Sequence, residues 1–187
     1  MNNYYIAMGA NLPSGKTSPK DTLNAAVNDL RQQNMTIAAI SPFYSTPCFP
    51  AGAGPDYVNA AIHLKCALSP KDMLAHLHGI EANHGRERLE RWGMRTLDLD
   101  LIACGDSILP DLETFEHWYD LPQEDQRRAA PSVLILPHPR LQDRAFVLVP
   151  LRDIAAEWRH PVLKLTVNEM CNALAPEALA EIVVLET

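Results

Sequence analysis

Apolar residues in the first 104 positions of the chain recur with two different periods. Runs of apolar and β-branched residues predict four strands, at residues 4–9, 35–44, 56–68 and 96–104. Apolar residues three or four positions apart, such as Leu23, Val27 and Leu30, predict a helix after the first strand, and the same spacing recurs after the third strand. Each helix opens with Ser-Pro-Lys-Asp, which supplies an N-cap, a first-turn proline and an acid three residues after the cap. Gly85 is expected to end the second helix.

The resulting order, strand-helix-strand twice over, predicts an α+β, ferredoxin-like fold in which helices pack on an antiparallel sheet. A chain of 187 residues is long enough to bury a sizeable core, so a single domain over 1–187 is expected. After residue 104 the pattern weakens. It predicts a helix at 146–156 that breaks near Pro150, a short helix at 166–174 and an edge strand at 181–185.

Charge is distributed unevenly along the chain. The formal net charge of −7 at pH 7 argues against a general nucleic-acid-binding surface. Residues 105–131 hold seven acids and two arginines, and we interpret this segment as an acidic insertion within the domain. The four cysteines form no Cys-x-x-Cys pair, and no apolar stretch reaches membrane-spanning length. We therefore expect a cytoplasmic protein, monomeric or weakly homo-oligomeric, with no nucleic-acid or membrane partner.

The most informative segment is 91–100, Arg-Trp-Gly-Met-Arg-Thr-Leu-Asp-Leu-Asp. Because side chains alternate along a strand, Asp98 and Asp100 share one face and the neighbouring leucines share the other. Two adjacent carboxylates repel each other unless a cation lies between them, and oxygen ligands suit Mg²⁺. Four arginines close by suit phosphate groups: Arg86, Arg88, Arg91 and Arg95. The segment indicates Mg²⁺-dependent phosphoryl-type transfer, although a half-exposed strand beside a solvated loop has the same pattern.

A second phosphate-binding candidate lies at residues 10–17, where Ala-Asn-Leu-Pro-Ser-Gly-Lys-Thr has the relaxed spacing of a Walker A loop. In a working loop the Lys and Thr open a helix, so that backbone amides and the helix dipole face the phosphate. Here Ser18 is the better N-cap, which leaves Lys16 and Thr17 outside the helix. A kinase that uses Lys16 and Thr17 remains a rival hypothesis.

Three further features have both a functional and an ordinary structural interpretation. His138 lies in a Pro-His-Pro-Arg turn near Arg144 and is either a donor to a nucleotide or part of a plain turn. Tyr57 and Asn59 share a strand face, which suits a flat heterocycle but also an ordinary core. Glu81 can contact a ribose hydroxyl or pair with a neighbouring cation.

Taken together, these segments resemble the 6-hydroxymethyl-7,8-dihydropterin pyrophosphokinase family. The resemblance rests first on Arg-Trp-Gly-x-Arg-Thr-x-Asp-x-Asp at 91–100, a long and specific motif. It extends to residues 6–12, 45–47, 55–61, 80–81, 85–86, 137–140, 144–146 and 150–151.

Enzymes of this family transfer the β,γ-diphosphate of ATP to the hydroxymethyl group of the pterin, releasing AMP, in folate biosynthesis. The resemblance implies that Asp98 and Asp100 hold two Mg²⁺ ions on the triphosphate, and that Arg86 and Arg95 lie in a mobile loop that assists the chemistry. The positions that match the pterin pocket are Thr46, Pro47, Tyr57, Asn59 and Phe146. The positions that match the ATP side are Glu81, Arg88, Trp92, Leu101, Leu134, His138 and Arg144.

Three features depart from the family pattern. The acidic segment 105–131 is longer than usual, Leu89 stands where a basic residue is common, and His78 stands where a glutamine is expected. None of these removes an aspartate or a loop arginine of the motif, so an active enzyme is expected. The alternatives are a P-loop-type kinase using Lys16 and Thr17, a non-catalytic pterin- or nucleotide-binding module, and a metal-dependent hydrolase.

Overall fold

The computed structural model describes residues 1–32, 35–48, 54–85, 95–122, 124–125 and 129–186. Within these ranges six strands form one sheet in the order β5-β1-β4-β3-β6, β2 also pairs with β4, and every pairing is antiparallel. The strands are β1 (Asn2–Ala10), β2 (Thr36–Ile40), β3 (Tyr44–Thr46), β4 (Tyr57–Cys66), β5 (Asp98–Cys104) and β6 (Val183–Val184). The antiparallel sheet confirms the predicted fold class.

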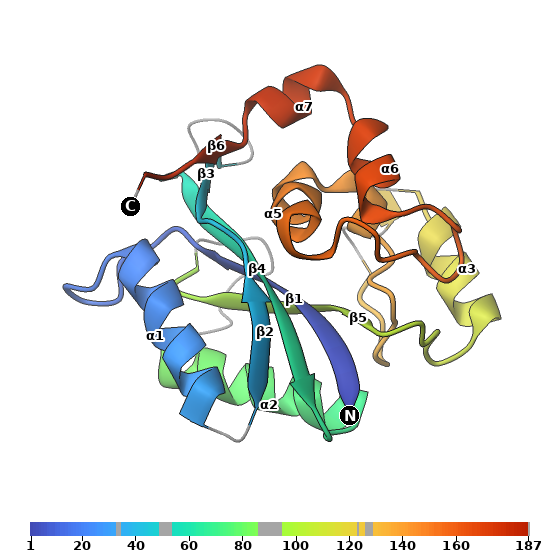
Figure 1. Ribbon diagram of the computed structural model, residues 1–187, viewed down its shortest axis with the longest axis horizontal. Helices are drawn as coiled ribbons and strands as arrows, with labels where there is room; N and C mark the ends of the chain where they lie inside the picture. The colour runs from blue at the N-terminus through green and yellow to red at the C-terminus, as the bar shows by residue number, and fades with distance from the viewer. Residues whose placement is uncertain (33–34, 49–53, 86–94, 123, 126–128, 187) are drawn as a thin grey trace.

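Helices α1 (Pro19–Gln32) and α2 (Pro70–Asn83) cover one face of the sheet (Figure 1). Both begin as predicted, because the Ser18 and Ser69 hydroxyls each accept a 3.2 Å hydrogen bond from the amide three residues further on. The first hydrophobic core lies between these helices and the sheet; its members include Tyr4, Ile6, Met8, Leu23, Leu77 and Leu99. This packing leaves the alternate residues of each strand on the opposite face.

The opposite face is covered in part by α5 (Ala145–Ala155), and α6 (Val167–Asn172) and α7 (Pro176–Ala180) follow it in the chain (Figure 1). A second core joins Tyr5, Ala61 and Ala103 of the sheet to Val147 and Leu148 of α5. Among the described residues, no helix has the length and apolar character needed to cross a membrane.

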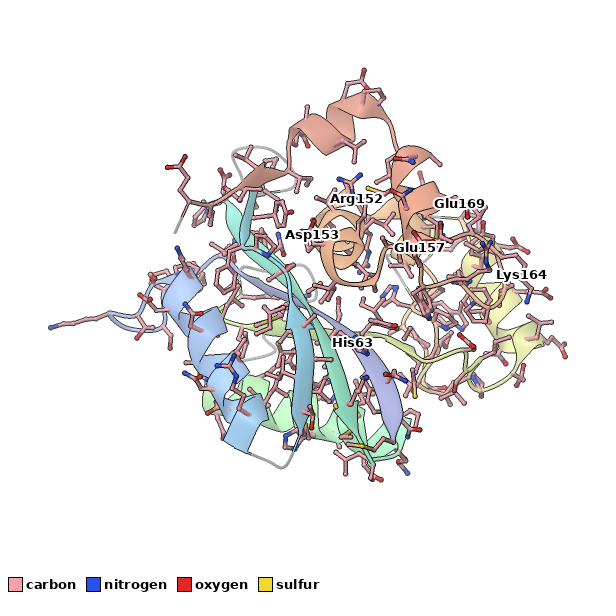
Figure 2. All side chains as sticks on the ribbon, viewed as in Figure 1. His63, Arg152, Asp153, Glu157, Lys164 and Glu169 are labelled. Atoms are coloured by element: carbon pink, nitrogen blue, oxygen red, sulfur yellow. The ribbon has the colours of Figure 1, made fainter. Side chains whose placement is uncertain are left out.

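A part-buried hydrogen bond also joins α5 to the sheet. Asp153 lies between α5 and β3 (Figure 2), where its Oδ2 accepts a 2.5 Å hydrogen bond from the hydroxyl of Tyr44. Burial of the phenol, together with the Asp153 carboxylate, raises the pKa of Tyr44 to about 12. The phenol therefore stays protonated at neutral pH and keeps donating to Asp153.

Three elements differ from the sequence-based prediction. The predicted strand 35–44 is two strands, because the Ser41 hydroxyl replaces a backbone partner of β4 and Pro42 has no amide to donate. Helix α5 continues through Pro150, because the packing of its apolar side chains in the second core outweighs one lost backbone hydrogen bond. The edge strand predicted over 181–185 is present but shorter, as the two-residue β6, and the short helix α7 precedes it.

Segment 105–131 contains a helix that the sequence analysis did not predict, α3 (Leu112–Asp120). Its N-cap, Asp111, accepts a 2.8 Å hydrogen bond from the Thr114 amide. Phe115 is fully buried, and its ring centroid lies 5.6 Å from that of His160. The packing of α3 therefore depends on a residue 45 positions away along the chain.

His160 is itself a buried polar residue. Its Nδ1 accepts hydrogen bonds from the amides of Val162 and Leu163, at 3.2 and 3.1 Å. Burial, with Lys164 nearby, lowers the pKa of His160 from 6.5 to about 4. The folded protein therefore holds this imidazole neutral at neutral pH.

Protein stability is expected to fall as the pH drops from about 6.5 to about 4, because the unfolded His160 gains a proton there and the folded one does not. His160 accounts for up to about 3 kcal/mol of that loss. His160→Asn, whose Oδ1 can accept the same amides, is expected to remove this part of the pH dependence. Chemical denaturation across this pH range measures it, with His117→Asn on the exposed side of α3 as the control. Identical slopes for His160→Asn and the wild type would contradict the assignment.

Candidate active site

Strand β5 carries the two predicted carboxylates on the face away from α1 and α2. Leu99 and Leu101 are buried in the first core, so Asp98 and Asp100 lie on the other side of the strand. In the sheet register, Gly9 of β1 lies beside Asp98, and Ala7 lies beside Asp100. The residues next to the carboxylates on this face are therefore small.

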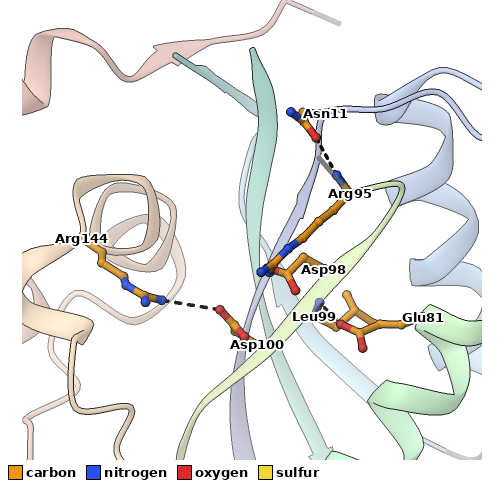
Figure 3. Close-up of polar contacts among 7 residues, drawn as sticks. All are labelled: Asn11, Glu81, Arg95, Asp98, Leu99, Asp100 and Arg144. Atoms are coloured by element: carbon orange, nitrogen blue, oxygen red, sulfur yellow. Dashed lines mark hydrogen bonds and ion pairs between the residues drawn. The ribbon is translucent and has the colours of Figure 1, made fainter. Parts of the chain in front are cut away.

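Two arginines contact the carboxylates, one each (Figure 3). Arg95, three residues before the first residue of β5, donates from Nη1 to Asp98 Oδ2. Arg144, at the start of α5, places Nη1 3.6 Å from Asp100 Oδ2. Burial alone would lower the pKa of Arg95, but Asp98 outweighs burial and holds that pKa above its ordinary value, whereas burial dominates at Arg144 and lowers its pKa. The two adjacent carboxylates are thus flanked by two arginines, one at each side of the pair.

His138 is held next to this charged group by a β-bulge. The pairing of β1 and β5 shifts register opposite Ile102, and the Ile102 carbonyl accepts a 2.8 Å hydrogen bond from the His138 amide. The His138 Nδ1 accepts a 3.0 Å hydrogen bond from the Arg140 amide. Burial, together with Arg144, lowers the pKa of His138 well below its ordinary value. The neutral ring therefore carries its proton on Nε2, which leaves a hydrogen-bond donor available.

The predicted pterin-side residues gather at β3 and β4. The Asn59 Nδ2 donates a 2.7 Å hydrogen bond to the Thr46 hydroxyl, and both side chains are buried. Tyr57 is half-buried on the same strand face, two positions before Asn59. A Cβ on Gly9 would lie 2.8 Å from Asn59 Oδ1, so the Asn59 side chain extends over β1, the strand that separates it from Asp98.

Two other residues predicted for the pterin pocket are more exposed than Asn59 and Thr46. Pro47 is exposed directly after β3. Phe146 is 40% exposed in the first turn of α5, with the Arg144 guanidinium 5.8 Å from its ring centroid. Phe146 therefore presents an aromatic ring to solvent beside an arginine that contacts Asp100.

Three predicted ATP-side positions have their side chains on the core side of the sheet. Glu81 is buried in α2, where Oε1 accepts a 2.8 Å hydrogen bond from the Leu99 amide. Leu101 is buried in the first core, and Leu134 packs partly buried against it. Because the Leu99 amide points away from β1, the backbone groups of Leu101, two residues on, also point to the open edge of β5. Leu101 can therefore meet a ligand through its backbone, and its side chain belongs to the core.

The remaining predicted residues either lie outside the described residues or lie away from the carboxylates. Arg86, Arg88 and Trp92 lie outside the described residues. Lys16 and Thr17 are exposed in a turn that precedes α1, and the helix begins only at Pro19. The arrangement of a P-loop, with Lys and Thr in the first helical turn, is therefore not formed at this position.

One buried residue of the site carried no specific signal in the sequence. Asn11 is 1% exposed directly after β1, and its side chain bonds the backbone of Arg95 and of Pro55. An asparagine after a glycine-containing strand is compatible with many turns, so only its hydrogen bonds show that Asn11 belongs to the site.

Among the described residues, no cluster of three or more metal-binding side chains is present. Asp98 and Asp100 are oxygen donors that fit Mg²⁺, an ion that usually completes its coordination with water and phosphate oxygens.

Residues 5–156 match the family described as 7,8-dihydro-6-hydroxymethylpterin-pyrophosphokinase, HPPK. The chain belongs to this family. Two relatives are named 2-amino-4-hydroxy-6-hydroxymethyldihydropteridine pyrophosphokinase. The Synechocystis relative is 37% identical over 164 residues, covering 84% of this chain and 73% of the relative. The Pseudomonas aeruginosa relative is 38% identical over 159 residues, covering 84% and 83%. The resemblance stated from the sequence is confirmed.

Solved structures of HPPK-DHPS proteins share the fold. One, in complex with substrates, aligns with 92% of this chain at a TM-score of 0.63 and 13% identity. A Plasmodium falciparum triple mutant aligns with 91% at a TM-score of 0.64 and 16% identity. This chain spans 43% and 41% of those two chains. At these identities the likeness concerns the fold alone.

Gly9→Ala is expected to lower the free energy of unfolding by about 1–3 kcal/mol, because the new Cβ would lie 2.8 Å from Asn59 Oδ1 and force that side chain to move. Gly79→Ala is the matched control. Gly79 is exposed on α2 with no atom within 4 Å of an added Cβ, so alanine there should stabilise by up to about 1 kcal/mol. Urea denaturation measures both variants, and equal effects would contradict the close approach of Asn59 to β1.

Proposed function

We propose that this chain transfers the β,γ-diphosphate of ATP to the hydroxymethyl group of 6-hydroxymethyl-7,8-dihydropterin and releases AMP, as expected for HPPK. The observation that carries the proposal is the shared sheet face. The Asp98 and Asp100 carboxylates, each contacted by an arginine, are separated by strand β1 from Asn59 of the buried Asn59–Thr46 pair. Side chains suited to a phosphate-bound metal ion and side chains suited to a heterocycle therefore lie on one sheet face, on either side of β1.

Asp98 and Asp100 would hold Mg²⁺, with two ions as the finer hypothesis. Bound Mg²⁺ would neutralise charge on the triphosphate and orient it for in-line transfer. The carboxylates supply only part of an octahedral shell, which leaves positions for phosphate oxygens. The two side chains suit Mg²⁺ because both offer carboxylate oxygens from neighbouring positions on one strand face.

The arginines would stabilise the negative charge that develops when AMP leaves. Arg95 and Arg144 lie beside the carboxylates, so their guanidinium groups are next to the expected phosphates. Arg86 would assist Arg95, as the family motif implies. The neutral His138 would donate from Nε2 to the nucleotide. The described residues include no obvious general base in this group, and a loose phosphoryl-transfer transition state needs little help from one.

The pterin would lie between the amide and hydroxyl of β3–β4 and the aromatic side chains. Asn59 and Thr46 offer hydrogen-bonding groups to the heterocycle, and the rings of Tyr57 and Phe146 offer flat apolar surfaces. Pro47 would complete the rim of this pocket. Fixing the pterin next to the carboxylates lowers the entropic cost of bringing its hydroxyl to the phosphorus.

The adenosine would lie along the open edge of β5. The Leu101 backbone and the Leu134 side chain are suited to the base, whereas Glu81 would act by fixing β5 through the Leu99 amide. Arg88 and Trp92 are assigned to the nucleotide on the family motif alone. An adenine at this edge would add hydrogen bonds to the side of β5 that pairs with no other strand among the described residues.

We further infer that residues 105–131 form an insertion within one domain spanning 1–187. The fully buried Phe115 supports this, because it packs α3 on the region around His160. We infer that the protein is a monomer or a weak homo-oligomer.

The deciding experiment is AMP formation from ATP and Mg²⁺, measured with and without 6-hydroxymethyl-7,8-dihydropterin. The proposal expects AMP release that depends on the pterin and stops when Mg²⁺ is chelated. Folded protein that forms no pterin-dependent AMP would overturn the proposal. Release of phosphate without the pterin would instead favour a metal-dependent hydrolase.

Asp98→Asn and Asp100→Asn are each expected to lower kcat by about 100-fold or more, because an amide binds Mg²⁺ more weakly than a carboxylate and leaves the phosphate charge uncompensated. Lys16→Ala is expected to keep kcat and KM within about twofold of the wild type, since surface positions away from a site have small effects. Steady-state kinetics on the three variants separates the two phosphate-site hypotheses. Loss of activity in Lys16→Ala with activity retained in Asp98→Asn would favour the P-loop kinase.

A further inference from the structure

Asn11 uses both ends of its side-chain amide in the buried part of the site. Its Oδ1 accepts a 2.8 Å hydrogen bond from the Arg95 amide, and its Nδ2 donates a 3.2 Å hydrogen bond to the Pro55 carbonyl. The Asn11 and Leu12 amides also donate to the Arg95 carbonyl, at 3.0 and 3.1 Å. Figure 3 shows Asn11 above Arg95, on the side away from Asp98. The amide orientation is fixed, because a flipped side chain would face each partner with a like group.

The two partners of Asn11 belong to different halves of the site. Arg95 carries the guanidinium that pairs with Asp98, on the phosphate side. Pro55 lies two residues before Tyr57, the first residue of β4, on the pterin side. One buried side chain, 1% exposed, therefore links the backbone that carries an arginine to the backbone that carries a pterin-side ring.

We infer that Asn11 is a positioning residue that couples nucleotide binding to pterin binding. This inference rests on the proposed function. Asn11 touches neither substrate and acts through the Arg95 and Pro55 backbones. A nucleotide that fixes Arg95 also fixes, through Asn11, the segment that leads into Tyr57, so the pterin binds to a site that is already ordered. By thermodynamic reciprocity the pterin tightens nucleotide binding by the same factor.

Ser41 provides a matched control, because it has the same pattern of bonds away from Arg95. Its buried hydroxyl donates to the Pro42 carbonyl at 2.8 Å and accepts from the Ala61 amide at 2.9 Å. Both Asn11→Ala and Ser41→Ala remove one donated and one accepted hydrogen bond, so both should lower the midpoint of thermal unfolding. Only Asn11→Ala should change the coupling between the two substrates.

The experiment measures the Kd of 6-hydroxymethyl-7,8-dihydropterin with and without a saturating ATP analogue that has a methylene group between the α- and β-phosphates. This analogue cannot release AMP. The wild type and Ser41→Ala should bind the pterin at least about fivefold more tightly with the analogue than without it. Asn11→Ala should lose this difference, and its kcat should fall about 10- to 100-fold with a smaller change in the KM for ATP. Asn11→Ser, whose side chain is too short to reach both partners, should give the same result as Asn11→Ala. It replaces Asn11→Ala in the experiment if the alanine variant does not fold.

Two results would overturn the inference. One is an equal tightening by the analogue in the wild type and in a folded Asn11 variant. The other is a loss of tightening in Ser41→Ala that matches the loss in Asn11→Ala, which would mean that general stability sets the effect. A wild type that forms no pterin-dependent AMP defeats the proposed function separately, because the binding ratio is measured without turnover.

Discussion

The repulsion between the Asp98 and Asp100 carboxylates is the constraint on which the rest of the site depends. Strand geometry places them on one face, so their charges must be balanced by groups from elsewhere in the chain. Arg95 balances one from the segment just before β5, and Arg144 balances the other from the start of α5. The docking of α5 against the second core is therefore part of the electrostatics of the site as well as of the fold.

The antiparallel register places Asn59 close to this charged group. Gly9 lies between Asn59 on one neighbouring strand and Asp98 on the other. Because Gly9 has no side chain, Asn59 can extend over β1 while it donates to Thr46. Asn59 and the two carboxylates are consequently held at a separation fixed by the strand spacing of a sheet, about 4.8 Å per strand.

The sequence predicted the elements whose local signals agree with their packing. The strands β1, β4 and β5 alternate and the capped helices α1 and α2 are amphipathic, so period and capping identified them. The prediction failed where a distant contact decides, as in α3, which packs through Phe115 on His160. The facing of the carboxylates followed from alternation, but the burial of Glu81 and the contacts of Asn11 did not, because both depend on partners remote in sequence.

The alternation of β5 side chains between the two faces of the sheet is interrupted once, so one face of the strand has two different parts. Leu101 and Cys104 both lie in the first core although they are three residues apart, which an unbroken strand does not allow. The bulge at Ile102 supplies the extra residue, so that the carboxylates precede it on this face and Ala103 of the second core follows it. The same bulge offers the carbonyl that holds His138. One irregularity thus separates the charged part of the face from its packed part and anchors a donor at the boundary.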